Sequence, residues 1–303
     1  MKTRIIVLAL LLCSALTSAQ QDSQYTQYMY NTVAINPAYA GSRGMMSIFG
    51  LYRTQWVGLE GAPKTALFSL NSPIGNSRLG YGVGFVNDKI GPTDQNTASI
   101  DLSYTVQASE TLKLSAGLKG SANFFSLDVN KLDPGQTTDQ NLNSYNSKFT
   151  PNIGAGVYLH GDQFYAGFSV PSFLQKYAYD DNNVKVDQEK MHLYFIGGYV
   201  FNAGMDFQIK PAVLFKAVQG APLQADLSLS ALYLEKLSIG AAYRWDAAWS
   251  AMAGFQVTDG IMIGYAYDRE TTALRNFNSG SHEVYLRFEL FTNYTNLGTP
   301  RFF

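Results

Sequence analysis

Residues 98–107 read ASIDLSYTVQ and alternate between apolar and polar side chains. Apolar side chains occupy every second position, with polar side chains between them (Ala98, Ile100, Leu102, Tyr104 and Val106). A period of two predicts a β-strand with one apolar face and one polar face. In a soluble sandwich the apolar face packs against a second sheet, whereas in a transmembrane barrel it faces lipid and the polar face lines the lumen.

The composition favours the membrane barrel. Only 15% of the 303 residues are charged, the net charge is -1, and there are 20 Tyr and 19 Phe residues. Charged residues make up about 25% of an average globular chain. A nearly neutral chain without a basic tract does not suit nucleic-acid binding. Beyond the first residues, no apolar run reaches the length of roughly 18 residues that a membrane-spanning helix requires.

The first 19 residues have the features of an export signal. Lys2 and Arg4 precede an apolar run over residues 5–12, and the small residues Thr17, Ser18 and Ala19 complete the pattern. We therefore expect cleavage after Ala19, with an uncleaved anchor as the alternative. The single cysteine, Cys13, lies inside this segment. The mature chain is then expected to lack thiols, and with them disulfides and thiol catalysis.

Alternation recurs from residue 79 nearly to the end of the chain, and its apolar positions carry no charge. With two earlier strands at about 45–56 and 63–72 and a last one at 281–291, the pattern predicts an all-β transmembrane antiparallel barrel of about 14 strands over residues 45–291. Pro211 falls inside one predicted strand, where the missing N–H indicates a local bulge. A soluble β-sandwich is the alternative fold.

The predicted connections are of two kinds. Tight turns lie near residues 75–78, 108–110, 160–163, 202–205, 235–236 and 258–260. They alternate with mostly longer links at 57–62, 89–95, 127–148, 174–190 and 270–280, and with short ones near 218–221 and 247. Short turns on one side and long loops on the other are typical of outer-membrane barrels. An even number of strands then places both termini on the short-turn side, which is the periplasmic side.

Two segments lie outside the predicted strands. In residues 20–44, Tyr25, Tyr28, Met29 and Val33 follow helical spacing until Asn36-Pro37 interrupts it. A short helix that covers the periplasmic mouth or enters the lumen would explain this pattern, and a disordered leader is the alternative. Residues 292–303 follow the last strand as a periplasmic tail.

Several motifs resemble those of the PorP/SprF family of type IX secretion system outer-membrane proteins. The chain begins with QYTQYMYNTVAINPAYAGS, continues with LYRTQWVGLEGAPKT, and later contains GAPLQADLSLSALY, IGYAYD and SGSHEVYLRFEL before it ends in PRFF. These blocks run from about residue 22 to residue 303. Thr32 departs from the family pattern, in which proline is expected.

The resemblance implies an outer-membrane barrel that works with type IX secretion and serves surface adhesion and gliding motility. Family members help to deliver large secreted adhesins to the cell surface and hold them there. The implied partners are secreted surface proteins with a C-terminal secretion domain, and type IX secretion components in the periplasm and outer membrane. The lipid bilayer surrounds the barrel, and no cofactor is implied.

Catalysis and metal binding find little support in the sequence. His160, His192 and His282 have no acid or nucleophile at a spacing that indicates a catalytic set. We therefore expect a non-enzymatic protein. Asp180 and Asp181 stand together in a predicted loop, where a calcium site is an alternative to ordinary solvation. The strand positions that alternate with the apolar ones carry six basic and five acidic residues. This near balance predicts ion pairs across the lumen rather than an ion-selective pore.

The loop with sequence RTQWVGLEGAP at residues 53–63 is the candidate partner site. With loops 127–148 and 174–190, it is expected to receive a secreted partner. The candidate residues also include the acidic pair and the family-like ending (Arg53, Gln55, Trp56, Gly58, Gly61, Pro63, Asp180, Asp181, Pro300, Arg301, Phe302 and Phe303). A passive diffusion channel for small solutes is the alternative function.

Overall fold

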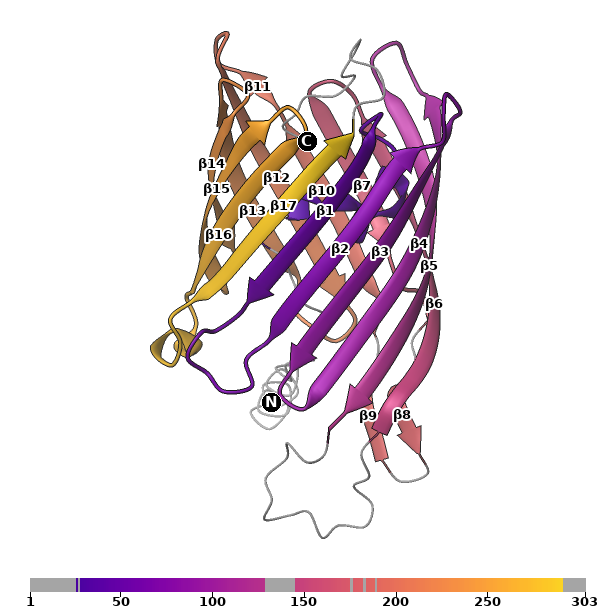
Figure 1. Cartoon of the computed structure of the whole chain (residues 1–303), viewed down its shortest axis with the longest axis vertical. Coiled ribbons are helices and arrows are strands. Elements are labelled where there is room, and N and C mark those ends of the chain that lie inside the picture. Colours follow the sequence, from indigo (N-terminus) through magenta and orange to yellow (C-terminus); the bar gives the residue numbers. More distant parts are fainter. Residues whose placement is uncertain are drawn as a thin grey trace, which may run out of the picture.

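A computed structural model describes residues 26, 28–128, 145–174, 177–181, 184–188 and 190–290, with the backbone alone for 145–148, 177–181 and 184–188. Its main feature is a closed antiparallel barrel of 14 strands, counting β10 and β11 as one interrupted strand (Figure 1). The strands are β1 Met46–Thr54, β2 Lys64–Pro73, β3 Leu79–Ile90, β4 Thr93–Gln107, β5 Lys113–Leu127, β6 Tyr145–His160, β7 Phe164–Val170, β10 His192–Tyr199 with β11 Phe201–Asn202, β12 Phe207–Val218, β13 Gln224–Tyr233, β14 Leu237–Arg244, β15 Ala248–Thr258, β16 Ile261–Glu270 and β17 Ser281–Leu290.

Smaller elements accompany the barrel. A separate hairpin is formed by β8 Tyr177–Asp181 and β9 Val184–Gln188. Short 3-10 helices are η1 Tyr28–Tyr30, η2 Thr32–Ala34, η3 Pro37–Tyr39 and η6 Ala273–Asn276. Within the described residues, no helix is long and apolar enough to cross a membrane.

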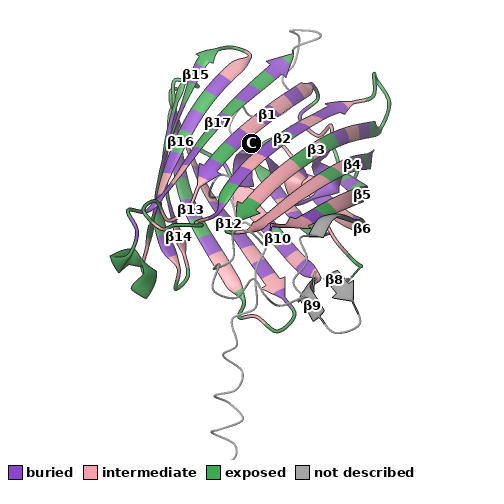
Figure 2. Ribbon diagram, turned by 60° about the horizontal axis from the view of Figure 1, so that its bottom comes forward, coloured by how far each residue is buried: buried purple, intermediate pink, exposed green. Residues whose placement is uncertain are grey.

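Every barrel strand pairs with its neighbours in the chain, and β1 pairs with β17 to close the barrel. The alternation found in the sequence sets which side chains face outward. Leu102 and Leu118 are 55% and 67% exposed, whereas Asp101 next to Leu102 is 2% exposed. Figure 2 shows the same alternation of buried and exposed residues along the strands. The apolar face therefore looks outward and the polar face lines the lumen, as the sequence predicts.

The two ends of the barrel differ, and we call them the short-turn end and the loop end. At the short-turn end β1 begins and β17 ends, since Met46 pairs with Leu290. The loop end holds the β1–β2 and β16–β17 connections and the η6 helix, and lies at the bottom of Figure 1. Outward aromatic side chains stand near both ends, as in the girdles of membrane barrels. They are Tyr52, Trp245 and Trp249 near the loop end, and Phe164, Phe207 and Tyr233 near the short-turn end.

Two sequence predictions are wrong in detail. The link expected at 89–95 is a two-residue turn, because β3 and β4 continue to Ile90 and from Thr93. Outward polar contacts stabilise this extension, since the Asn87 amide donates to Asp94 at 2.7 Å and to Asn96 at 2.9 Å.

Pro211 does not produce a bulge, because it pairs with Leu229 in an uninterrupted register between β12 and β13. On its other side the ladder stops at Gly198–Ala212 and resumes at Phe201–Ile209. The missing N–H of Pro211 therefore falls in the gap between β10 and β11, where no ladder bond is lost.

Candidate functional site

The N-terminal segment of the described chain runs through the barrel lumen. We call this segment, residues 26 and 28–45, the strap; it is the indigo ribbon inside the barrel in Figure 1. Thr26 contacts Arg53, Asp268 and Glu283 near the loop end. Arg43 contacts Glu289 near the short-turn end, where the strap continues into β1. Thr26, the first described residue, therefore lies near the loop end, and the strap leaves the lumen at the short-turn end. The described chain thus begins at the end opposite to the one where the sequence places the N-terminus.

The strap forms a series of 3-10 turns rather than the single helix that its spacing predicts. Asn36 caps η3, because its side-chain oxygen accepts the Ala38 N–H at 3.0 Å. Its amide nitrogen donates to the Val157 carbonyl of the wall at 3.0 Å. Contacts with the wall therefore set the backbone of this segment, and these contacts cannot be seen in local spacing.

Aromatic side chains join the strap to the wall of the barrel. Tyr30 stacks on Tyr285 with ring centroids 5.1 Å apart, and Tyr285 stacks on Phe49 at 5.3 Å. The Lys210 ammonium lies 5.3 Å from the Tyr30 ring centroid, within cation–π range.

Glycines on the lumen face make room for the strap. A Cβ atom on Gly117 of β5 would collide with the backbone nitrogen of Ala38, and one on Gly156 of β6 would collide with the side-chain oxygen of Asn36. The small residues of the polar parity therefore form a surface that is complementary to the strap. Their role explains why glycines and charges share one face in the sequence.

Wall side chains also make hydrogen bonds with the strap. Ser103 donates to the Ala40 carbonyl at 2.6 Å, and Ser169 donates to the Ile35 carbonyl at 2.7 Å. In addition, Ser69 donates to the Asn31 side chain at 2.8 Å. Because β2, β4 and β7 all contribute, the strap is fixed to the barrel wall on several sides.

The predicted ion pairs are present in the lumen. Lys119 pairs with Asp101 at 2.9 Å, Arg244 with Asp226 at 3.1 Å, and Arg287 with Glu289 at 3.4 Å. Arg43 of the strap joins Glu289 at 2.6 Å. Opposite charges therefore lie side by side, unlike the single-sign rings of selective pores.

Arg53 lies inside the barrel, 2% exposed, rather than on the loop surface. Its Nη1 atom is 2.6 Å from Asp268 and 3.0 Å from Glu283, and also donates to the Thr26 hydroxyl at 3.1 Å. The backbone N–H of Thr26 donates to Glu283 at 3.1 Å. We call these four residues the Thr26 clamp. Sequence reasoning identified Arg53 but missed the clamp, because its members are far apart in the chain.

Trp56 marks the start of the candidate loop at residues 55–63. It has a positive φ of 47°, which is rare for a bulky residue. Its indole N–H donates to Glu270 at 3.0 Å, and its backbone N–H donates to Ser281 at 3.2 Å. Gln55 and Pro63 close the loop base through a backbone hydrogen bond of 2.9 Å.

The same loop is joined to both neighbouring connections. Val57 exchanges two backbone hydrogen bonds with Ser279 and Gly280 of the β16–β17 connection. Gly61, which is exposed like Gly58, accepts a bond of 2.9 Å from Gly91 of the β3–β4 turn. Loop 55–63 is therefore part of a continuous hydrogen-bonded rim, and Arg53 connects this rim to the lumen.

The other candidate residues are not brought to this rim by the described structure. Asp180 and Asp181 lie on β8, of which the backbone alone is described. Pro300, Arg301, Phe302 and Phe303 lie outside the described residues. Among the side chains that are described, no group of three or more His, Cys, Asp or Glu residues is arranged to hold a metal ion.

The three histidines are far apart in the barrel. His160 ends β6 and stacks on Tyr158, whereas His192 begins β10 at the opposite end. His282 lies on β17, where its Nδ1 atom is 2.6 Å from the Tyr265 hydroxyl. These positions do not assemble a catalytic set.

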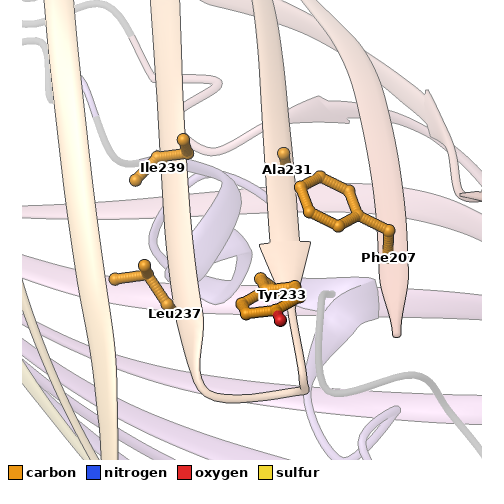
Figure 3. Close-up of a pocket in the computed structure, with 5 residues that line it drawn as sticks. All are labelled: Phe207, Ala231, Tyr233, Leu237 and Ile239. Atoms are coloured by element: carbon orange, nitrogen blue, oxygen red, sulfur yellow. The ribbon is translucent and has the colours of Figure 1, made fainter.

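A groove of about 160 Å³ lies on the outer wall and is lined by Phe207, Ala231, Tyr233, Leu237 and Ile239 (Figure 3). Its lining is apolar and comes from outward positions of β12, β13 and β14. Such a surface suits acyl chains of the bilayer, and the Tyr233 hydroxyl is the one polar side-chain group among the lining residues.

A family model described as "Type IX secretion system membrane protein PorP/SprF" matches residues 17–288. The chain belongs to the PorP/SprF family. None of the curated proteins matches this PorP/SprF chain in sequence. Among solved structures it is similar to the CymD monoaromatic hydrocarbon channel, with 12% identity, a TM-score of 0.50, and coverage of 91% of this chain and 95% of that one.

A second similar structure is the outer-membrane protein Omp33 of Acinetobacter baumannii, with 9% identity and a TM-score of 0.47. That match covers 81% of the PorP/SprF chain and 98% of Omp33. At such low identity the similarity to CymD concerns the fold alone. Family and fold together place this PorP/SprF protein in the bacterial outer membrane, as a membrane protein of the type IX secretion system.

Proposed function

We propose that this protein helps to deliver secreted surface proteins and anchors them at the cell surface through protein–protein contacts at the loop end. The observation that carries the proposal is the strap, which is held inside the lumen by contacts with the barrel wall. The strap is buried along its length, with Tyr28, Met29 and Val33 at 5%, 3% and 2% exposure. A barrel closed in this way has its outer rim, rather than its interior, available for a partner.

The proposed partner at the rim is a secreted adhesin with a C-terminal secretion domain. In this arrangement the loop end faces the cell surface, and the short-turn end and the tail at 292–303 face type IX components in the periplasm. Loop 55–63 is the proposed contact surface because it is exposed yet held in one conformation. Its strained Trp56 supports this role, since residues with rare backbone conformations gather at functional sites. No catalytic step and no cofactor enter this mechanism.

Deletion of residues 57–62 tests the proposal. The bond between Gln55 and Pro63 spans the loop base, so the barrel should still fold without these residues. Cells with this variant should lose surface retention of the adhesin while the barrel remains in the outer membrane. The matched control replaces the short turn Glu235-Lys236 by Asn-Gly, which should leave retention unchanged. Normal retention by the deletion variant would reject the loop as the partner site.

A passive diffusion channel is the second candidate function, favoured only by the barrel fold itself. Conductance of the purified full chain in planar bilayers separates the two candidates. A sealed anchor should be nearly silent, whereas a diffusion channel should give stable conductance steps.

A further inference from the structure

One row of outward side chains at the loop end is polar across six neighbouring strands. In order around the wall it comprises Tyr267, His282, Thr54, Lys64, Lys89 and Asp94, and each residue is the direct cross-strand partner of the next. These positions have the same parity as the exposed Tyr52, Phe68 and Phe85, so their side chains face outward. We call this set the polar row. It marks the boundary between the apolar wall and the lipid headgroups.

The polar row carries an excess of positive charge. Lys64 and Lys89 are direct partners, both exposed, and like charges in directly opposite positions are unfavourable. Asp94 pairs with Lys89 at 3.2 Å. Within the described part of the chain, the ion pairs include Lys89 but not Lys64. An anion that bridges the two ammonium groups would remove the repulsion between them.

Further basic groups flank this pair of lysines. Arg269 lies two residues beyond Tyr267 on the outward parity, and Arg275 is exposed in η6. The Nδ1 atom of His282 is bound to the Tyr265 hydroxyl, which leaves the other ring nitrogen for a ligand. The turns at the opposite end are mainly acidic, with Glu110, Asp162, Asp206, Glu235 and Asp259 against Arg78 and Lys236. Within the described residues, the loop end also carries the acidic residues Glu60, Asp128, Asp246 and Glu270.

We propose that Lys64 and Lys89 bind a phosphate group of a glycolipid headgroup in the outer leaflet. Lysine binds phosphate as a point charge, and basic side chains are attracted to an anionic membrane surface. The choice of the outer leaflet rests on the proposed function, in which the loop end faces the cell surface. The bound lipid would lie against β2 and β3, beside loop 55–63.

Native mass spectrometry of the delipidated full chain tests this site. With phosphorylated lipid A the natural protein should form a one-to-one adduct, and the double variant Lys64→Gln/Lys89→Gln should bind at least tenfold more weakly. The matched control is Lys113→Gln/Lys236→Gln, which removes the same charge at the short-turn end and should bind like the natural protein. Dephosphorylated lipid A should bind the natural protein as weakly as phosphorylated lipid A binds the Lys64/Lys89 variant.

Three results would overturn the proposal. Equal binding by the two double variants would show that Lys64 and Lys89 make no site, and equal binding of dephosphorylated lipid A would show that acyl chains alone are recognised. Equal binding of phosphatidylglycerol or inorganic phosphate would contradict the assignment to a glycolipid. The Lys64/Lys89 variant should retain the adhesin normally, so failure of the lipid site is distinguishable from failure of the proposed anchoring function.

Discussion

Arg53 of the barrel wall and Thr26 of the strap are joined by a hydrogen bond of 3.1 Å from Nη1 to the hydroxyl oxygen. The same Nη1 atom contacts Asp268 and Glu283, so one guanidinium holds two carboxylates and the end of the strap. Trp56 follows Arg53 by three residues and is bound to the strands that carry these carboxylates. The Thr26 clamp therefore connects the loop rim to the sealed lumen.

Replacement of Arg53 by alanine should free the N-terminal end of the strap. Asp268 and Glu283 would remain buried without their guanidinium, and removing one partner of a buried ion pair costs roughly 3–5 kcal/mol. The measurement is maleimide labelling of Met29→Cys, a side chain that is 3% exposed in the natural protein. Labelling should be slow with Arg53 present and at least tenfold faster in the Arg53→Ala background.

Arg275→Ala is the control for this experiment, because it removes an exposed arginine at the same end of the barrel. It should leave labelling of Met29→Cys slow. Unchanged labelling in the Arg53→Ala background would mean that the clamp does not hold the strap.

Valine at position 117 should loosen the fit between the strap and β5. The added side chain would collide with the backbone of Ala38, and overpacking of this kind costs about 1–3 kcal/mol. Gly120→Val on the same strand is the matched control, because a Cβ atom there meets nothing within 4 Å. Urea unfolding in detergent should give a lower midpoint for Gly117→Val than for Gly120→Val. Equal midpoints would show that the glycine surface does not hold the strap.

Deletion of residues 26–44 should open the lumen. The natural chain should be nearly silent in planar bilayers, and the deletion variant should give stable conductance steps. The remaining lumen charges are of both signs and paired, so little preference between cations and anions is expected. Stable steps from the natural chain would contradict the sealed lumen and favour the diffusion channel.

The barrel could be predicted from the sequence because strand alternation is a local signal. For a residue such as Leu102 or Asp101, the alternation with its immediate neighbours in the sequence predicts whether its side chain faces outward or into the lumen. Two details differ from the prediction, the missing bulge at Pro211 and the longer strands β3 and β4, and both depend on how the strands pair. Pro211 needs no bulge, because the backbone N–H that it lacks would lie at the break between β10 and β11. Strands β3 and β4 extend further than predicted, because the Asn87 amide donates a hydrogen bond to Asp94 beyond the apolar wall.

The route of the strap could not be predicted, because its conformation depends on distant partners. Asn36 is positioned by Val157, and Thr26 by Glu283, which are far away in the chain. The signal that was available is the set of glycines on the lumen parity, including Gly117 and Gly156. These glycines leave room on the lumen face, but their spacing does not identify the segment that occupies it. Arg53 was a candidate residue in the sequence, but its partners Asp268 and Glu283 come from the closing strands of the barrel, far away in the chain.

A mild-detergent pull-down of the C-terminally tagged protein from outer membranes, read by mass spectrometry, tests the anchoring function most directly. The predicted result is co-purification of a large surface protein with a C-terminal secretion domain, and its loss when residues 57–62 are deleted. Recovery of the barrel alone, or of the same partners with and without the loop, would contradict the account.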